Sequence, residues 1–274
     1  MHVKAQAPAI TVSHQARALQ PGEVVWVRIV APEPLAGARV SGFGRETDAV
    51  RVMAAGDAGE LWQAVVGIDV EVKPGPATVR VHARTATGPP ATADHVVRVE
   101  ARSFRQRTLR VDPKYVSPPP DVQARIAREA NRLNAIYATV THHHLVAPPF
   151  DLPVPHPMNS PFGVQSVYNG QVRGRHNGVD FASPAGTPIR APAPGRVVLA
   201  DDLYYTGLTV VIDHGQGVYT IFAHLSRLGT AEGAPVASGD VVGDVGSTGR
   251  STGPHLHWSL RVGGARVDPL SLVE

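Results

Sequence analysis

The sequence contains no cysteine. Disulfides, thiolate nucleophiles and cysteine-ligated zinc are therefore excluded, and any metal ion would have to be bound by His, Asp or Glu. No apolar run approaches the length of about 20 residues that a transmembrane helix needs. The first residues, MHVKAQAPAI, also lack the basic start and apolar core of a signal peptide. The sequence alone leaves open whether the protein is cytoplasmic or exported.

A strong charge of one sign is also missing, since 26 Lys and Arg stand against 23 Asp and Glu. The basic excess is local: residues 102–132 hold eight basic side chains and three acidic ones. Such a segment could favour an anionic polymer or surface, but no basic motif with interleaved aromatic residues supports nucleic acid. We interpret the segment as a solvated linker and helix face, and predict no nucleic-acid partner.

Residues 1–110 show a series of short valine-rich strands. Pro and Gly separate VVWVRIV (24–30), ELWQAVVGI (60–68), ATVRVHAR (77–84) and HVVRVEAR (95–102). Several short strands with such turns and no helical pattern predict a small immunoglobulin-like β-sandwich. This region has no cluster of ionisable residues of the kind that catalysis needs, so we predict a binding or spacer module.

A helical pattern appears in residues 111–158, the predicted linker. Apolar residues of DVQARIAREANRLNAIYATV recur at three- and four-residue intervals, which is typical of one face of an amphipathic helix. They are Val122, Ile126, Ala130, Leu133, Ile136 or Tyr137, and Val140. Prolines precede the pattern and Asp121 stands in its first turn, both suited to a helix start. We predict that this helix joins two domains.

Residues 159–274 return to a β pattern with many glycines. VVIDHGQGVYTIFAHL (210–225) predicts two strands around a turn at residues 215–217, and HLHWSLRV (255–262) predicts a further strand. The chain is therefore expected to be mainly β, with a C-terminal domain of antiparallel strands.

Two histidines of GPHLHW, His255 and His257, lie two residues apart on this last strand and so project to the same face. Leu256 and Trp258 then point to the other face and into the core. Taken alone, the pair fits exposed strand histidines better than a metal site.

Three further candidates in the same predicted domain change that interpretation: His176 and Asp180 of RHNGVDF, and His224 of FAHLS. Zinc accepts imidazole nitrogen and carboxylate oxygen, and a catalytic zinc has three protein ligands and an open position for water. Two histidines and one aspartate would meet that count. The remaining two histidines could then act in acid–base and electrostatic roles.

HNGVD, FAHLS and GPHLHW, in this order, resemble the HxGxD, single-histidine and HxH motifs of the lysostaphin-type (LytM-like) zinc endopeptidases, which cut peptide cross-links in bacterial cell walls. The phrases SPFG, YNGQ, FASPAGTPIRAPAPGRV and VIDHGQGVYT also match, so that the resemblance covers about residues 159–270. The preceding β domain and helix look, more loosely, like regions before this domain in some bacterial envelope members.

The resemblance implies one Zn²⁺ per chain, with His176, Asp180 and His257 as its ligands. His224 and His255 become the catalytic pair: one takes the proton of the attacking water and the other stabilises the oxyanion. Which histidine does which stays open. The chain has no HExxH, so the glutamate base of thermolysin-like enzymes is absent.

The resemblance also matches Asn169 and Tyr205 to positions that line the substrate groove. In one departure, FGVQSVYNG carries Gln165 and Ser166 where relatives often read FGxRR, which bears on contacts near the cleft and not on the metal site. We interpret His214, beside a turn glycine, as structural. We interpret the histidines at 142–144 as a loop, because three adjacent side chains on an extended chain alternate in direction.

The expected function is a zinc endopeptidase that hydrolyses cross-links or stem peptides of peptidoglycan, located in the bacterial envelope, periplasmic or secreted. The N-terminal module would then bind other cell-wall proteins. The alternative is a non-catalytic or autoinhibited scaffold that activates other cell-wall hydrolases. A third interpretation makes the N-terminal module the main actor, as a polysaccharide- or protein-binding domain.

Overall fold

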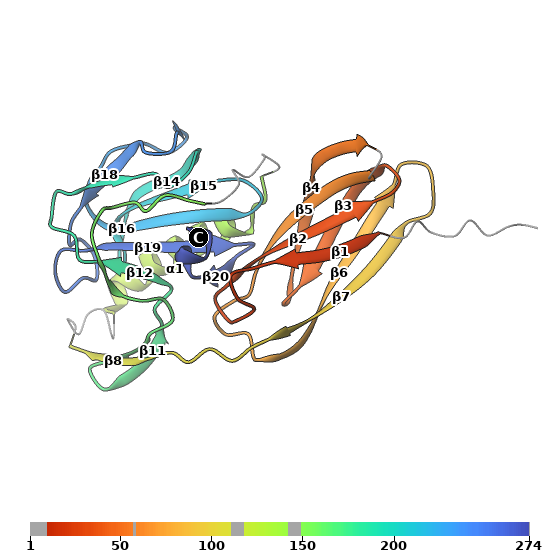
Figure 1. Cartoon of the computed structure of the whole chain (residues 1–274). Coiled ribbons are helices and arrows are strands. Elements are labelled where there is room, and N and C mark those ends of the chain that lie inside the picture. Colours follow the sequence, from red (N-terminus) through yellow and green to blue (C-terminus); the bar gives the residue numbers. More distant parts are fainter. Residues whose placement is uncertain (1–9, 57–58, 111–117, 142–148, 274) are drawn as a thin grey trace, which may run out of the picture. The chain divides into compact units, whose positions relative to one another are not determined.

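The computed structural model describes residues 10–56, 59–110, 118–141 and 149–273 (Figure 1). The chain divides into two compact units, Met1–Arg102 and Ser103–Glu274. Strands dominate both units, and α1 (Pro120–Ala138) is the one α-helix in the described parts of the chain. The prediction of a mainly β fold with antiparallel sheets is confirmed. The histidines at 142–144 lie outside the described residues.

The first unit is one antiparallel path of seven strands, in the order β1-β2-β5-β4-β3-β6-β7. Its core is rich in valine, as the alternating pattern predicts, and every second side chain of β6 is buried in its middle. The strands are β1 (Thr11–Gln15), β2 (Val24–Ala31), β3 (Leu35–Gly42), β4 (Arg45–Gly56), β5 (Gly59–Gly67), β6 (Gly75–Thr85) and β7 (Ala91–Val99).

The two edge strands of this path come close to each other. His14 on β1 and His95 on β7 are within hydrogen-bond distance, with Nδ1 of His14 2.7 Å from Nε2 of His95. The long strand β4 pairs with both β3 and β5, so it carries the sheet around the core. The unit is thus a nearly closed, barrel-like antiparallel sheet.

The second unit holds the remaining strands in two sheets. The larger follows the order β17-β14-β15-β16-β19-β12-β9, with β13, β18 and β20 paired beside it. A 3-10 helix, Pro269–Leu272, closes the described chain. The strands of the larger sheet are β9 (Met158–Ser160), β12 (Gly178–Phe181), β13 (Pro188–Arg190), β14 (Gly195–Leu203), β15 (Gly207–Asp213), β16 (Val218–Leu228), β17 (Pro235–Val236), β18 (Val241–Val245), β19 (Leu256–Val262) and β20 (Ala265–Val267).

The smaller sheet contains a strand from the segment that leads into this unit. β8 (Gln106–Leu109) pairs in parallel with β10 (Gln165–Tyr168), which pairs on its other side with β11 (Gln171–Arg175). Arg107 stands opposite Ser166 in this register. The sequence assigned residues 103–110 to the N-terminal module, whereas these strands place them in the second unit.

Helix α1 forms where the apolar periodicity predicts it, and Asp121 lies in its first turn. Its residues Leu133, Ile136 and Tyr137 pack against a buried cluster that includes Leu199 and Tyr219 of the main sheet. The helix is therefore docked on the second unit by its apolar stripe.

The sequence suggested a solvated basic segment, but two arginines of this segment make ion pairs with the main sheet and a neighbouring loop. The Arg125 side chain pairs with Asp202, and that of Arg132 pairs with Asp201 and Glu232. These ion pairs form because the basic face of α1 lies along acidic residues of β14 and of the loop between β16 and β17.

Candidate metal centre and active site

Three neighbouring strands, β16, β19 and β12, bring the candidate residues together. On β19, Leu256 and Trp258 are fully buried, as the alternation predicts, and His257 points to the other face. In the register of the sheet, His257 stands opposite Asp180 of β12. At Gly178 a Cβ atom would lie 2.3 Å from the Trp258 carbonyl oxygen. The glycine of HNGVD therefore lets β12 approach β19 closely.

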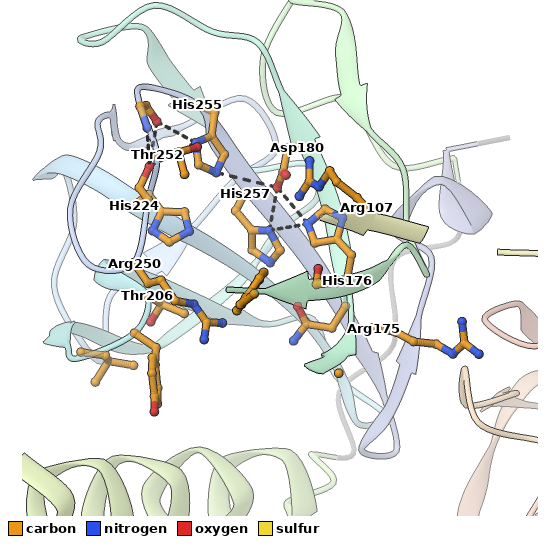
Figure 2. Close-up of a pocket in the computed structure, with 18 of the residues that line it drawn as sticks. Arg107, Arg175, His176, Asp180, Thr206, His224, Arg250, Thr252, His255 and His257 are labelled. Atoms are coloured by element: carbon orange, nitrogen blue, oxygen red, sulfur yellow. Dashed lines mark hydrogen bonds and ion pairs between the residues drawn. The ribbon is translucent and has the colours of Figure 1, made fainter. Parts of the chain in front are cut away.

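His176, just before β12, completes a compact group of three possible ligand atoms (Figure 2). Nε2 of His176 lies 2.9 Å from Oδ1 of Asp180 and 3.1 Å from Nδ1 of His257, and the last two atoms are 2.8 Å apart. Ligands about 2.0 to 2.1 Å from a tetrahedral zinc ion stand about 3.3 Å from one another. The triangle therefore has the size of one face of a zinc site.

The outer contacts of the two rings also suit a metal. Nδ1 of His176 lies 2.9 Å from the Pro161 carbonyl oxygen, which can only accept, so this nitrogen carries the proton and Nε2 keeps a lone pair. Nε2 of His257 lies 2.7 Å from Oγ of Ser259. When His257 donates to that hydroxyl, three lone pairs face one point. A cation relieves their repulsion, so the residues present fit a bound metal ion.

Burial and mutual contact set the charges of this group. Burial alone would raise the pKa of Asp180, but the contacts with His176 and His257 hold it well below its usual range. Burial lowers the pKa of His257, against the effect of the Asp180 carboxylate. Asp180 is thus held as a carboxylate and His257 favours its neutral form, which are the protonation states that metal binding requires of these two residues.

His224 reaches the site because β16 contains a bulge. Between the pairs Val210–Phe222 and Leu208–Leu225, β16 has one residue more than β15. His224 adopts φ = 64° there, a conformation that L-residues rarely adopt and that re-aims the side chain. Its Nδ1 donates to the carbonyl oxygen of Thr248 at 2.8 Å, which leaves a lone pair on Nε2.

His224 and His255 lie next to each other, with ring centroids 4.9 Å apart. Burial, followed by the neighbouring rings of His257 and His255, lowers the pKa of His224 to about 3. Nδ1 of His255 donates to the Gly253 carbonyl oxygen at 2.8 Å, and its Nε2 is 3.9 Å from Oδ1 of Asp180. In the neutral form of each ring, these contacts place the lone pair on Nε2, beside the candidate metal ligands.

All five residues line one cleft of about 1060 Å³ in the second unit. The side chains of His176, Asp180, His255 and His257 keep 10 to 17% of their surface exposed to it. Helix α1 forms one wall through Ile126, Ala130 and Leu133. The candidate site is thus buried on the core side and open to the cleft.

The other predicted positions fall in different places. Tyr205 lines the cleft, whereas Asn169 occupies the turn between β10 and β11 at φ = 50°, and the described cleft-lining residues do not include it. Gln165 and Ser166 lie on β10, and Ser166 faces the cleft. His214 is built into the core, where Nδ1 donates to the Pro194 carbonyl oxygen and Nε2 contacts Oγ1 of Thr220.

Sequence reasoning missed the four arginines of the cleft, among them Arg107 and Arg250. Arg107 arrives on β8, which lies outside the motifs, and its approach to β10 depends on the pairing of distant segments. Arg250 lies within GSTGRSTG, four residues before the proline of GPHLHW. Only this closeness in sequence could have suggested that it lies beside the site.

Comparison with known proteins is consistent with this geometry. The sequence pattern of Peptidase family M23 matches residues 174–269. The crystal structure of a candidate M23 peptidase from Pseudomonas aeruginosa superposes with a TM-score of 0.72 at 35% identity, over 94% of this chain and 96% of that one. The chain belongs to peptidase family M23. The resemblance to the lysostaphin-type metallopeptidases is therefore confirmed.

Two curated relatives are named as peptidases, one of them as a peptidoglycan peptidase. The DD-carboxypeptidase/endopeptidase Mpg of Neisseria meningitidis is 45% identical over 115 residues, 42% of this chain and 26% of the relative. The peptidoglycan DD-endopeptidase ShyA of Vibrio cholerae is 44% identical over 95 residues, 35% of this chain and 22% of the relative. The chain thus spans about a quarter of the length of these curated relatives. Within the described residues, no helix combines the length and the apolar character that a membrane span needs.

Proposed function

We propose that this chain is a zinc-dependent endopeptidase that hydrolyses peptide cross-links or stem peptides of bacterial peptidoglycan in the cell envelope. The observation that carries the proposal is the triangle of His176, Asp180 and His257, open to a cleft beside two further histidines. Membership of family M23 and the names of the curated relatives support the substrate class.

His176, Asp180 and His257 would hold the ion through Nε2, Oδ1 and Nδ1. A Zn²⁺ ion supplies a Lewis acid for the scissile carbonyl and lowers the pKa of a water molecule to about 7. The Pro161 carbonyl and the Ser259 hydroxyl fix the two imidazole rings from behind, so the ligand atoms are oriented before a metal binds.

His224 and His255 would move the protons. Because each donates Nδ1–H to a backbone carbonyl, each offers Nε2 as a proton acceptor on the cleft side. A ring that has accepted the proton of the attacking water then has an N–H to offer to the developing oxyanion or to the leaving amine. The two rings are close enough to divide these roles on one substrate.

The test combines metal analysis with digestion of purified sacculi. We expect about one zinc per chain and release of peptide fragments that mass spectrometry identifies. The variant His257→Ala should lose both the metal and the activity, and His255→Ala should keep the metal and lose about 10² to 10⁴ in rate. The matched control is His82→Ala, at an exposed position on β6 of the first unit. Full digestion of sacculi by His257→Ala would contradict the proposal.

The second candidate function is a scaffold that activates other hydrolases without cutting. Helix α1, which walls the cleft, is the observation that favours it, because a fixed wall can restrict a polymeric substrate. A zinc-bound protein that binds sacculi and releases no peptide from them, or from short synthetic peptides, would select this candidate.

A further inference from the structure

The cleft carries positive charge that the proposed mechanism does not use. Four arginines line it: Arg107, Arg110, Arg175 and Arg250. The two carboxylates among the described lining residues are both engaged, Asp180 by the histidines and Glu129 by Arg125 and the backbone N–H of Tyr204. The cleft is therefore suited to a ligand that brings negative charge with it.

The backbone pairing of β8 positions Arg107 beside the cleft. Its residue pairs with Ser166 in the parallel register, and its Nε atom is buried with no hydrogen-bond acceptor in the described parts of the protein. An N–H group that is shielded from water without an acceptor is unfavourable. A movement of the Arg107 side chain toward the cleft that it lines would let a ligand oxygen satisfy this group.

Arg250 is positioned by two aromatic rings. Its guanidinium carbon lies 5.1 Å from the ring centre of Tyr168 and 4.8 Å from that of Tyr205, and its backbone N–H donates to the Tyr205 carbonyl oxygen. Stacking against ring faces fixes the guanidinium plane and leaves its edge N–H groups available for an oxyanion. Figure 2 shows this side chain reaching into the pocket, whereas that of Arg175 extends away from the metal ligands.

We propose that Arg107 and Arg250, which both line the cleft, recognise carboxylate groups, so that the cleft selects peptides with a free carboxylate near the bond that is cut. A carboxylate is the anion that a peptide substrate carries, and its two oxygens match the two N–H groups on one edge of a guanidinium. This proposal rests on the proposed peptidase function and names its substrate class.

The test uses two synthetic peptides that differ only in one group, a free carboxylate in the first and a carboxamide in the second. Binding is measured by fluorescence anisotropy on the metal-free full-length protein, so that neither hydrolysis nor metal coordination contributes. The acid should bind about tenfold more tightly than the amide, since a charge-assisted hydrogen bond contributes that much. The preference should shrink as salt rises.

Variants assign the preference to particular side chains. R107Q and R250Q should each reduce the acid preference by about half or more on a logarithmic scale, chiefly because the acid peptide binds more weakly. R107K keeps the charge and loses the paired N–H groups of the guanidinium. Its acid preference should lie between that of R107Q and that of the unaltered protein. The charge-matched control is R190Q, on β13 outside the cleft, where the arginine contacts the Gly239 carbonyl oxygen.

The outcomes separate this proposal from the proposed function. Equal binding of acid and amide, or an equal loss of preference in R190Q, overturns carboxylate recognition even when both peptides are cut by the zinc-loaded protein. Preferential binding of the acid that R107Q and R250Q abolish supports it, even when the loaded protein cuts neither peptide and the peptidase function fails. Should R107Q not fold, R107K and R250Q give the same decision.

Discussion

Ser259 and Ser160 each contact one imidazole ring of the candidate metal site, but at different distances. Oγ of Ser259 lies 2.7 Å from Nε2 of His257. Oγ of Ser160 lies 3.4 Å from Nδ1 of His176, which already donates to the Pro161 carbonyl oxygen. Ser259→Ala should weaken zinc affinity by about 10- to 100-fold because the His257 ring loses its outer partner. Ser160→Ala should change it little. Competition with a calibrated chelator measures both, and equal affinities of the two variants would contradict this assignment.

His214 makes the stability of the second unit depend on pH. Burial lowers its pKa to about 4, below the usual 6.5 of the unfolded chain. Between these values the unfolded chain binds a proton that the folded protein does not, so the free energy of unfolding decreases as the pH falls from 6.5 to 4. The loss amounts to about 3 kcal/mol.

Urea unfolding at pH 7.0 and pH 4.5 measures this effect in the unaltered protein and in His214→Gln. The variant is less stable at pH 7, because the contacts to Pro194 and Thr220 are disturbed. Its stability should nevertheless fall less between the two pH values, since the titrating group is gone. A pH dependence identical in both proteins would show that other groups carry it.

Among the structural elements, β16 carries the least expected feature, the bulge at His224. At φ = 64° a Cβ atom costs about 1 to 2 kcal/mol, so His224→Gly should be more stable than His224→Ala by about 1 kcal/mol. The matched pair is Ser226→Gly and Ser226→Ala on the same strand, where φ is not positive and alanine should be the more stable residue. Chelator-treated protein is used, so that metal binding does not contribute. The same ranking at both positions would contradict the bulge.

The elements differ in how far the sequence could predict them. Alternation on β19 and the apolar stripe of α1 are local patterns, so the strand, the helix and the buried Leu256 and Trp258 follow from them. The bulge at His224 depends on the register between β15 and β16, and the place of Arg107 depends on the pairing of β8 with a strand almost 60 residues away. Such long-range registers leave no periodic signal in a single sequence.

The candidate site shows the same division. Motif order and resemblance were enough to nominate His176, Asp180 and His257, which the strands bring within about 3 Å of one another. Asn169 was nominated in the same way and lies in the turn between β10 and β11. A match in sequence position does not fix the direction in which a turn residue points. The contacts of the two imidazole rings with Pro161 and Ser259 could not be predicted, since they depend on the final packing of loops.

At the scale of the whole molecule, the boundary between the two units decides which fragment keeps a complete cleft. Residues 103–110 belong to the second unit, where Phe104 packs edge-on against Phe162 and β8 covers the edge of β10. A Cβ atom at Gly163 would lie 2.0 Å from the Phe104 ring, so this glycine is what allows the segment to lie so close. Residues 103–110 are therefore an integral, packed part of the second unit.

Two fragments test this boundary, residues 103–274 and residues 111–274. Both retain the three candidate ligands, so both should bind zinc with equal stoichiometry. The shorter fragment loses Arg107 and uncovers a strand edge, so it should unfold at lower urea, associate at high concentration and bind acid and amide peptides alike. The longer fragment should match the full chain in all three measurements. A longer fragment without zinc would show that the second unit depends on the first, and equal behaviour of the two fragments would show that β8 adds nothing to the cleft.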